Sequence, residues 1–342
     1  MQAAGEYADI SVLVTGAQGF IGAWLAQRLL EEGARVVVPR RDVDPRSRFR
    51  TEGIEDRCEI VPADVTDYHA VLRLLSEHEV QVVFHLAAQP IVGIANRSPL
   101  STLESNVRGT YTLLEACRVK GVVGKSVERV VVASSDHAYG DQEELPYRED
   151  FALNATFPYD VSKACTDMIA RSYAATYDMP IAVTRLANVY GGGDRNWSRI
   201  VPDLARSLVW GQRPVIRSDG TPQRDYLYVE DAVDAYLTVA RSLDVPKLRG
   251  RAWNAGLGQP LSVLEMARRL VTVSGKELEP DVRGAGAPEA EVDRLYLDST
   301  AIREELGWSP RWELDRGLRE TWEWYERHLA HEASQPLREP AA

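Results

Sequence analysis

Two short segments of the sequence carry side chains whose types and spacing could move protons. In the first, Ser135, Asp136 and His137 follow one another at the end of an apolar run. In the second, Tyr159 and Lys163 stand four residues apart, so a helix would place them on one face. Together these groups can take a proton from a hydroxyl, accept one from carbon and give one to a leaving group.

A glycine-rich loop at residues 15–22 lies between the first predicted strand and the first predicted helix. Gly16, Gly19 and Gly22 allow a tight turn, close approach of the backbone to a pyrophosphate and packing of helix on strand. The N-terminus of the helix adds amide donors and the positive end of its dipole. In this strand–turn–helix context the loop predicts dinucleotide binding rather than an ordinary tight turn.

The end of the second predicted strand bears on the choice between NAD and NADP. Where an acidic residue usually holds the adenosine ribose, this chain has Arg40 and Arg41, followed by Asp42. Arginine can accommodate a 2′-phosphate there, which favours NADP. In the alternative, Arg40 stacks on adenine and Asp42 turns back to the ribose. Asp64 and Val65, after the third predicted strand, are candidate adenine contacts or part of a solvent-facing turn.

Tyr159 and Lys163 fit the same cofactor. A nearby ammonium and a positive nicotinamide ring would stabilise the tyrosinate and lower the phenol pKa from about 10 towards neutrality. Ser135, expected at the end of a strand, can hydrogen-bond the same substrate hydroxyl. The three residues therefore predict oxidation of an alcohol.

The first half of the chain alternates short β-branched runs with helical patterns, which predicts a parallel sheet covered on both faces. Expected strands are 10–15, 35–39, 60–62, 82–86, 130–134, 181–185, 214–216 and 252–255. Expected helices are 21–32, 69–79, 105–120, 159–177, 197–211, 229–242, 262–274, 300–306 and 315–329. We therefore expect an α/β fold with a doubly wound Rossmann sheet in residues 1–187, to which a segment at about 225–260 returns. A smaller C-terminal α/β substrate-binding lobe is expected at 188–331 and a flexible tail at 332–342.

Composition narrows the partners. The chain has 342 residues, 44% of them hydrophobic, yet no apolar stretch approaches the ~20 residues that span a bilayer. A net charge of −11 argues against a nucleic-acid surface. Three scattered cysteines lack metal-ligand spacing and suit reduced thiols in the cytoplasm, and the N-terminus has no secretory pattern. The composition predicts a cytoplasmic protein with neither a metal site nor a membrane partner.

Besides the glycine loop and the Ser135, Tyr159 and Lys163 set, further segments of the sequence match the pattern of a known protein family. They are His85–Gln89, Asn106, Asn188–Gly191, Asp219–Gly220 and Arg224–Tyr226. With them, nearly the whole chain resembles an extended short-chain dehydrogenase/reductase that acts on nucleotide sugars. The resemblance implies a tightly bound NAD(P) that is regenerated in each turnover, and a nucleotide-diphosphate sugar as substrate.

The residues after Ser135 suggest the subgroup. In the 4-epimerases of this family they are usually small or apolar, whereas 4,6-dehydratases read Thr or Ser, then Asp, then Glu or Lys. The stretches 159–163 and 191–197 are similar to dehydratases acting on CDP-glucose or GDP-mannose. The resemblance thus implies a nucleotide-sugar 4,6-dehydratase. The alternatives are a 4-epimerase or related sugar oxidoreductase, and a cofactor-binding protein without turnover.

The resemblance assigns each catalytic group a task. Tyr159 takes the proton of the 4-hydroxyl, and a neutral Asp136 protonates the departing 6-hydroxyl, which requires a raised pKa. His137 departs from the family pattern. A neutral imidazole could serve as the base at C5, or the ring could be a bystander beside the nicotinamide.

The resemblance also implies the binding residues. The full set of expected cofactor contacts is Gly16, Gln18, Gly19, Phe20, Ile21, Gly22, Arg40, Arg41, Asp64, Val65, Leu86, Ala87, Ala88, Gln89, Asn106, Tyr159, Lys163 and Leu186. The expected substrate contacts are Gln89, Ser135, Asn188, Arg195, Asn196, Arg199, Val201 and Arg224. The guanidinium of Arg224 suits phosphate oxygens, although it could instead pair with Asp225 or Glu230. Arg195, Trp197 and Arg199 could contact phosphate and base, or simply brace their loop.

Assembly is expected from the resemblance as well. Family members commonly dimerise through the helices predicted at 105–120 and 159–177. The apolar faces of both helices allow such a homodimer, although helices that pack on the sheet would show the same pattern.

Overall fold

The computed structural model describes residues 5–123, 127–284 and 292–330. Its centre is a parallel sheet of seven strands in the order β11-β6-β5-β4-β1-β2-β3. The strands are β1 (Ser11–Thr15), β2 (Arg35–Arg40), β3 (Glu59–Pro62), β4 (Val82–His85), β5 (Arg129–Ala133), β6 (Ile181–Leu186) and β11 (Ala252–Ala255). The chain winds outward from β1 in both directions, as the predicted doubly wound Rossmann fold requires.

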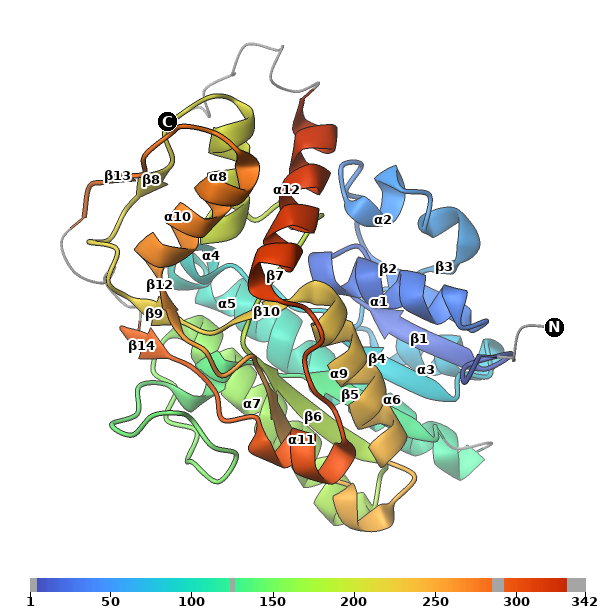
Figure 1. Cartoon of the computed structure of the whole chain (residues 1–342). Helices are drawn as coiled ribbons and strands as arrows, with labels where there is room; N and C mark the ends of the chain where they lie inside the picture. Colours follow the sequence, from blue (N-terminus) through green and yellow to red (C-terminus); the bar gives the residue numbers. More distant parts are fainter. Residues whose placement is uncertain (1–4, 124–126, 285–291, 331–342) are drawn as a thin grey trace.

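Helices cover both faces of this sheet (Figure 1). On one face lie α1 (Phe20–Glu31) and α9 (Val229–Ser242), which contact each other over a core that includes Trp253 of β11. The other face carries α3 (Tyr68–Glu77), α6 (Gly109–Val123) and α7 (Pro158–Tyr177), packed on a second apolar cluster. The central strands β1, β4, β5 and β6 are buried along almost their whole length, which suits the valine-rich sequences of β1, β4 and β5.

Capping residues visible in the sequence begin several helices. Asp67 caps α3 by accepting from the backbone N–H of Ala70 at 3.0 Å. Ser262 and Glu265 form a capping box at the start of α10 (Val263–Ser274). Pro158 opens α7, where its fixed φ suits the first turn and its missing N–H costs nothing. This start places the next residue, Tyr159, in the first turn of α7.

The segment expected as one helix at 105–120 is not a regular α-helix throughout. It begins in a π-helical turn at Glu104–Arg108 and continues as α6, and the short helix α5 (Pro99–Leu103) directly precedes it. The short helices α2 (Arg48–Thr51), η1 (Glu55–Arg57) and α4 (Val92–Arg97) were not expected either. The π-turn turns the side chain of Asn106 into the protein, where it joins a buried hydrogen-bond network.

The C-terminal lobe is built from short pieces around a third apolar cluster. Its helices are α8 (Ile200–Val209), α10 and α12 (Leu314–Leu329). Its strands are β7 (Asn188–Tyr190), β8 (Val215–Ile216), β9 (Gln223–Arg224), β10 (Tyr226–Tyr228), β12 (Leu261–Ser262), β13 (Asp281–Val282) and β14 (Arg294–Leu295). Between them the chain returns to the large sheet through α9, η4 (Pro246–Leu248) and β11, and α11 (Thr300–Leu306) packs against β11. The predicted tail at 332–342 lies outside the described residues.

Two further findings concern partners. Within residues 5–123, 127–284 and 292–330, no helix is both long and apolar enough to cross a membrane. The same residues contain no cluster of three or more His, Cys, Asp or Glu side chains arranged for a metal ion. Cys58, Cys117 and Cys165 are all free thiols.

Candidate functional site

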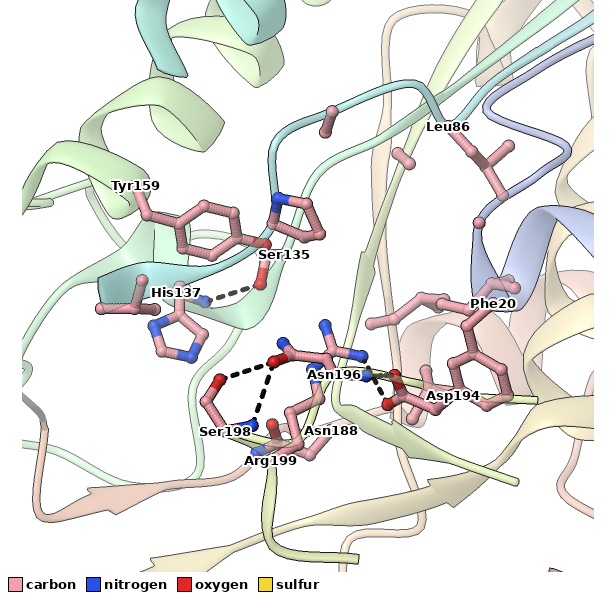
Figure 2. A pocket seen from close by; sticks show the side chains of 18 of the residues that line it. Phe20, Leu86, Ser135, His137, Tyr159, Asn188, Asp194, Asn196, Ser198 and Arg199 are labelled. Carbon is pink, nitrogen blue, oxygen red and sulfur yellow. Dashed lines mark hydrogen bonds and ion pairs between the residues drawn. The ribbon is translucent and has the colours of Figure 1, made fainter. Parts of the chain in front are cut away.

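A cavity of about 800 Å³ runs from the glycine loop, past the carboxyl ends of the strands, into the C-terminal lobe. Figure 2 shows the cavity from close by, with Phe20 and Leu86 on one side of the view and Ser135, His137 and Tyr159 on the other. The loop that carries Asp194, Asn196, Ser198 and Arg199 closes one side. Doubly wound sheets bind ligands at this edge.

The glycine loop has the geometry that a dinucleotide requires. Gly16 has φ +75°, and a Cβ there would lie 2.8 Å from the backbone nitrogen of Ala87. At Gly22 a Cβ would lie 2.2 Å from the carbonyl oxygen of Gly16. Gly19 begins α1 without a side-chain cap, so the first N–H groups of the helix remain available to an anion. These residues fit a dinucleotide pyrophosphate.

The adenosine end of the cavity differs from the expectation for Arg40. Its guanidinium pairs with Glu55 of η1, and Arg40 is not among the residues that line the cavity. Arg41 and Asp42 do line it, but Nε of Arg41 donates to the Asp42 carboxylate at 2.6 Å. Both arginines that were expected to bind a 2′-phosphate are therefore already paired with carboxylates of this chain. The preference for NADP expected from these two arginines loses its structural basis.

A buried chain of hydrogen bonds links the cofactor loop to the catalytic helix through His85. Oγ1 of Thr15 accepts from the N–H groups of Leu86 and Ala87, so its proton goes to Nδ1 of His85, 2.8 Å away. Nε2 of His85 then donates to Oγ1 of Thr110 at 3.0 Å. Burial lowers the pKa of His85 to about 3, which keeps the ring neutral.

The network continues through the π-turn. Oγ1 of Thr110 donates to the carbonyl oxygen of Asn106, whose amide in turn donates to Oγ of Ser162 at 2.8 Å. Oγ of Ser162 donates to the carbonyl oxygen of Tyr159 at 2.6 Å. Oδ1 of Asn106 also accepts from the N–H of Gln89 at 2.7 Å. Asn106 thus ties the loop after β4 to the first turn of α7.

Tyr159 and Lys163 lie one helical turn apart and line the cavity, as their spacing predicts. Nζ of Lys163 donates to the carbonyl oxygen of Ala133 at 2.8 Å, and burial lowers its pKa to about 8. Burial raises the pKa of Tyr159 to about 12, against the lowering effects of the Arg199 charge and the Ser135 hydroxyl. A cation bound beside the phenol would counter the effect of burial.

Asp136 and His137 lie on a 3₁₀ turn, η3 (Asp136–Tyr139), that directly follows β5. Oδ1 of Asp136 accepts from Oγ of Ser135 and from the N–H of His137, both at 2.9 Å. Oδ2 is buried, and no group in the described part of the chain hydrogen-bonds to it. Burial raises the pKa of Asp136 and outweighs the lowering effects of His137 and Ser135. A proton on this carboxyl would sit on Oδ2, because Oδ1 already accepts two bonds.

The far end of this turn is held by a buried ion pair. The Tyr139 hydroxyl donates to Oδ1 of Asn254 and accepts from Nη1 of Arg185, both at 2.7 Å. Arg185 and Asp167 are fully buried and joined by two hydrogen bonds of 2.8 and 3.0 Å. The turn is thus fastened to β6, α7 and β11 through Tyr139.

The C-terminal lobe contributes several side chains to the cavity wall, most of which carry N–H donors. Asn188, Arg199, Val201 and Arg224 line the cavity, as does Arg217. Nη1 of Arg199 pairs with Oδ2 of Asp194 at 3.1 Å, and Nη1 of Arg224 donates to the carbonyl oxygens of residues 223 and 293. Arg199, Arg217 and Arg224 thus all lie on the cavity wall, and guanidinium groups suit a doubly charged diphosphate.

Most of the expected site residues line this cavity. The exceptions are Arg40, Gln89, Asn106 and Arg195. The Gln89 side chain bonds to the backbone of Ile91 and to Thr102, and Asn106 acts in the buried network. Arg195 lies over the ring of Trp197, which packs on Tyr325, so this part of the loop is braced rather than open.

Besides Arg217, Asp160 and Tyr226 were missed by the sequence reasoning. Asp160, directly after Tyr159, lies within hydrogen-bond distance of the His137 ring. Tyr226 lines the cavity beside Asn188, its partner across β7 and β10, and its hydroxyl has no hydrogen-bond partner among the described residues. Asp160 had a signal in the sequence, because its place on α7 follows from that of Tyr159.

The fold and the site define a dinucleotide-dependent enzyme of the short-chain dehydrogenase/reductase type. The chain matches the NAD dependent epimerase/dehydratase family over residues 12–256, and it belongs to that family. It is a nucleotide-sugar-modifying enzyme, because its relatives of both kinds act on such substrates.

Two curated relatives represent those two kinds. A CDP-glucose 4,6-dehydratase of Salmonella typhimurium is 30% identical over 328 residues, covering 92% of this chain and 90% of the relative. A UDP-glucose 4-epimerase of Mycolicibacterium smegmatis is 33% identical over 321 residues, covering 92% and 97%. Identity at this level does not separate the two activities.

A solved structure extends the comparison. The UDP-glucose-4-epimerase of Stenotrophomonas maltophila, with bound NAD and formylated UDP-arabinopyranose, superposes with a TM-score of 0.84 at 28% identity. The match covers 94% of this chain and 99% of that one. The whole architecture is therefore shared, lobe included.

Proposed function

We propose that the protein is a nucleotide-sugar 4,6-dehydratase, which converts an NDP-hexose into the NDP-4-keto-6-deoxyhexose. The observation that carries this proposal is the buried Asp136 carboxyl, whose raised pKa and unpaired Oδ2 suit a proton donor. Besides a hydride acceptor, oxidation at C4 needs only Ser135, Tyr159 and Lys163. An acid beside an imidazole is an addition that a simple epimerisation does not use.

The first task of the chain is to take the proton of the 4-hydroxyl. Bound NAD supplies the hydride acceptor for C4 and later returns that hydride to C6. Tyr159 accepts the hydroxyl proton, and the Ser135 hydroxyl orients the same oxygen. Lys163, whose pKa is about 8, is largely protonated at neutral pH and stabilises the tyrosinate.

The second task is elimination of water across C5 and C6. The 4-ketone acidifies the hydrogen on C5, and the neutral imidazole of His137 removes it as a proton. Asp136 gives its proton to the departing 6-hydroxyl, which leaves as water. His137 then returns a proton to C5, and the proton from the 4-hydroxyl replaces the one that Asp136 lost. The net change is the loss of one water molecule.

The sugar diphosphate would be held by the lobe. Arg199, Arg217 and Arg224 supply positive charge, and Asn188 and Tyr226 each carry a buried polar atom without a described partner. A diphosphate or sugar hydroxyl would satisfy both. Because the dehydratase relative acts on CDP-glucose, we propose CDP-glucose as the first substrate to test.

The test is incubation of the purified protein and NAD with CDP-, UDP-, dTDP- and GDP-linked hexoses. We expect a 4-keto-6-deoxy product from at least one of them, detected by its ultraviolet chromophore in alkali and by a C6 methyl signal in proton NMR. If each sugar nucleotide is returned unchanged or only inverted at C4, the proposal is wrong.

The second candidate is a nucleotide-sugar 4-epimerase, favoured by the 33% identity to an enzyme of that activity. In this case Asp136 and His137 would only shape the cavity, and Asp136→Asn would retain most of the turnover. A non-catalytic cofactor-binding protein is a third candidate. Reduction of bound NAD by any nucleotide sugar would exclude it.

We propose NAD rather than NADP as the cofactor. Arg40 is paired with Glu55 and Arg41 with Asp42, whose carboxylate stands on the cavity wall and would repel a 2′-phosphate. NAD is also the nucleotide bound in the solved epimerase. Calorimetric titration of the protein stripped of nucleotide should give tighter binding of NAD. Equal or tighter binding of NADP would refute the preference.

We also propose a homodimer through α6 and α7. Large apolar side chains are exposed on these helices and on α5, among them Leu100 at 71%, Met168 at 59% and Tyr111 at 44%. Exposed apolar groups on neighbouring helices favour association. Sedimentation should give the mass of two chains, and Met168→Asp should shift the population to one. A single-chain mass for the wild type would refute the dimer.

A further inference from the structure

The carboxylate of Asp160 touches the imidazole that the proposed reaction uses as a base. Asp160 lies in the first turn of α7, and only 3% of its surface is exposed. Its Oδ1 lies 3.0 Å from Nδ1 of His137. The contact joins the catalytic helix to the catalytic turn, two elements that reach the cavity from different parts of the chain.

The contact determines which nitrogen of His137 is available for chemistry. An ionised carboxylate only accepts hydrogen bonds, so Nδ1 of the ring must carry the hydrogen. In the neutral ring Nε2 then holds the free lone pair, and no group in the described part of the chain hydrogen-bonds to it. His137 lines the cavity, and Figure 2 shows its ring beside that of Tyr159. Nε2 is thus the nitrogen that can receive a proton from substrate.

The ring is fixed from several sides. Its edge meets the Tyr159 ring at a centroid distance of 5.7 Å and an interplanar angle of 71°. The backbone N–H of His137 donates to Oδ1 of Asp136 and Oγ of Ser135. With Nδ1 bonded to Asp160, the ring has one orientation rather than two. A base that must reach a single hydrogen on C5 benefits from this restriction.

We propose that Asp160 is a positioning residue for His137, which sets the tautomer of the imidazole, aims Nε2 at the substrate and strengthens it as a base. The proposal rests on the proposed function, because it assumes that His137 removes the C5 proton.

The charges around His137 support the proposal that Asp160 makes the imidazole a stronger base. Burial lowers the pKa of His137, but the hydrogen bond to Asp160 and the charges of Asp136 and Asp160 outweigh it, and the pKa is raised. Arg224, which faces the ring from the lobe, opposes them. A higher pKa makes the neutral ring a stronger base and requires a higher pH to produce it.

A purely structural role for Asp160 makes different predictions. A carboxylate in the first turn of a helix interacts favourably with the helix dipole. If that were its whole contribution, replacing it would lower stability without changing the titration of His137. Asp160→Asn separates the two roles, because the amide is nearly isosteric but can donate to Nδ1 and so favour the wrong tautomer.

The first experiment is an NMR titration of the histidine rings in the full-length protein with NAD, with the His137 signal assigned by His137→Gln. We expect Asp160→Asn to lower the pKa of His137 by about one unit or more, and Asp160→Glu to restore part of the shift. Asp178→Asn is the matched control. Asp178 is an exposed residue at the end of the same helix, and asparagine tolerates its positive φ of 50°. An unchanged His137 pKa in Asp160→Asn would overturn the proposal.

The second experiment measures the pH profile of C5 proton exchange in a nucleotide sugar that the wild type oxidises. In Asp160→Asn we expect the acidic limb to move to lower pH and the plateau to fall about ten- to a hundredfold, with C4 oxidation nearly unchanged. A uniform loss of rate with no movement of the limb would also overturn the proposal. If the wild type never exchanges the C5 hydrogen, the dehydratase function fails. The titration then decides separately whether Asp160 controls the ring.

Discussion

The two halves of the catalytic site are built in different ways. Tyr159 and Lys163 belong to a regular helix, and their relative position follows from helical geometry alone. Asp136 and His137 belong to a short 3₁₀ turn that is held in place by partners elsewhere in the chain, such as Asp160, Arg185 and Asn254, as well as by its own local hydrogen bonds. In the proposed function, the helical half would perform the oxidation that epimerases and dehydratases have in common. The turn would decide the fate of the 4-ketone, so the distinctive chemistry of the proposal depends on the less autonomous element.

The largest effect is expected from the helical half. Tyr159→Phe removes the group that takes the hydroxyl proton and leaves the ring packing against His137 intact. Turnover of any nucleotide sugar should fall by a factor on the order of 10³ to 10⁴. Absorbance of reduced nicotinamide and product analysis by NMR measure this loss. Retention of more than a tenth of the activity would contradict the role of Tyr159.

The next largest effect is expected from the turn, where one substitution should impair dehydration but not oxidation. Asp136→Asn keeps the shape of the carboxyl but cannot act as an acid, so dehydration should fall by a factor on the order of 10² to 10³. Oxidation at C4 should continue, visible as accumulated reduced nicotinamide in a single turnover. Asp141→Asn, at an exposed position just beyond the same turn, is the control and should retain full activity. Equal loss of oxidation and dehydration in Asp136→Asn would mean that the two halves do not act separately.

A smaller effect is expected where the turn is anchored. Tyr139→Phe removes the hydroxyl that hydrogen-bonds to Asn254 and Arg185, so each of these buried side chains loses one partner. The free energy of unfolding should fall by about 1–3 kcal/mol. Dehydration should slow more than oxidation, because the turn loosens while α7 is untouched. Urea unfolding and the two partial reactions measure these effects. Tyr68→Phe, on α3, should leave both near wild type, and a Tyr139→Phe variant as stable as wild type would refute the anchoring role.

The smallest effect concerns the network behind the helical half. His85 has a folded pKa of about 3, against about 6.5 in an unfolded chain. Between these values the unfolded chain binds a proton that the native protein does not, so stability falls as the pH drops through this window. His85→Gln should reduce the slope of the free energy of unfolding against pH. His69→Gln, at an exposed position, should leave it unchanged. An unaltered slope in His85→Gln would show that the ring titrates normally in the fold.

The same contrast explains how much could be predicted from the sequence. Apolar strands and helical periodicity gave the parallel sheet and the helical half of the site, because both depend on local patterns. Arg40 was expected to line the cavity but does not, because its guanidinium pairs with Glu55 of a short 3₁₀ turn. Asp160 was missed for a related reason: its partner, His137, lies 23 residues away in sequence. Asn106 and Gln89 were expected at the cavity, but a π-turn that no propensity indicates places Asn106 in a buried network. The Gln89 side chain bonds to Ile91 and Thr102 instead.

The most direct test of the dehydratase proposal is the reaction of the wild-type protein and NAD with CDP-glucose in D₂O, followed by proton and deuterium NMR. The proposed steps predict a 4-keto product with a C6 methyl group and deuterium at C5, because the hydride moves within the sugar while the C5 proton exchanges with solvent. Should CDP-glucose not react, the accepted nucleotide sugar from the panel takes its place. A product inverted at C4 that keeps its original C5 hydrogen and its 6-hydroxyl would contradict the proposal and identify the protein as an epimerase.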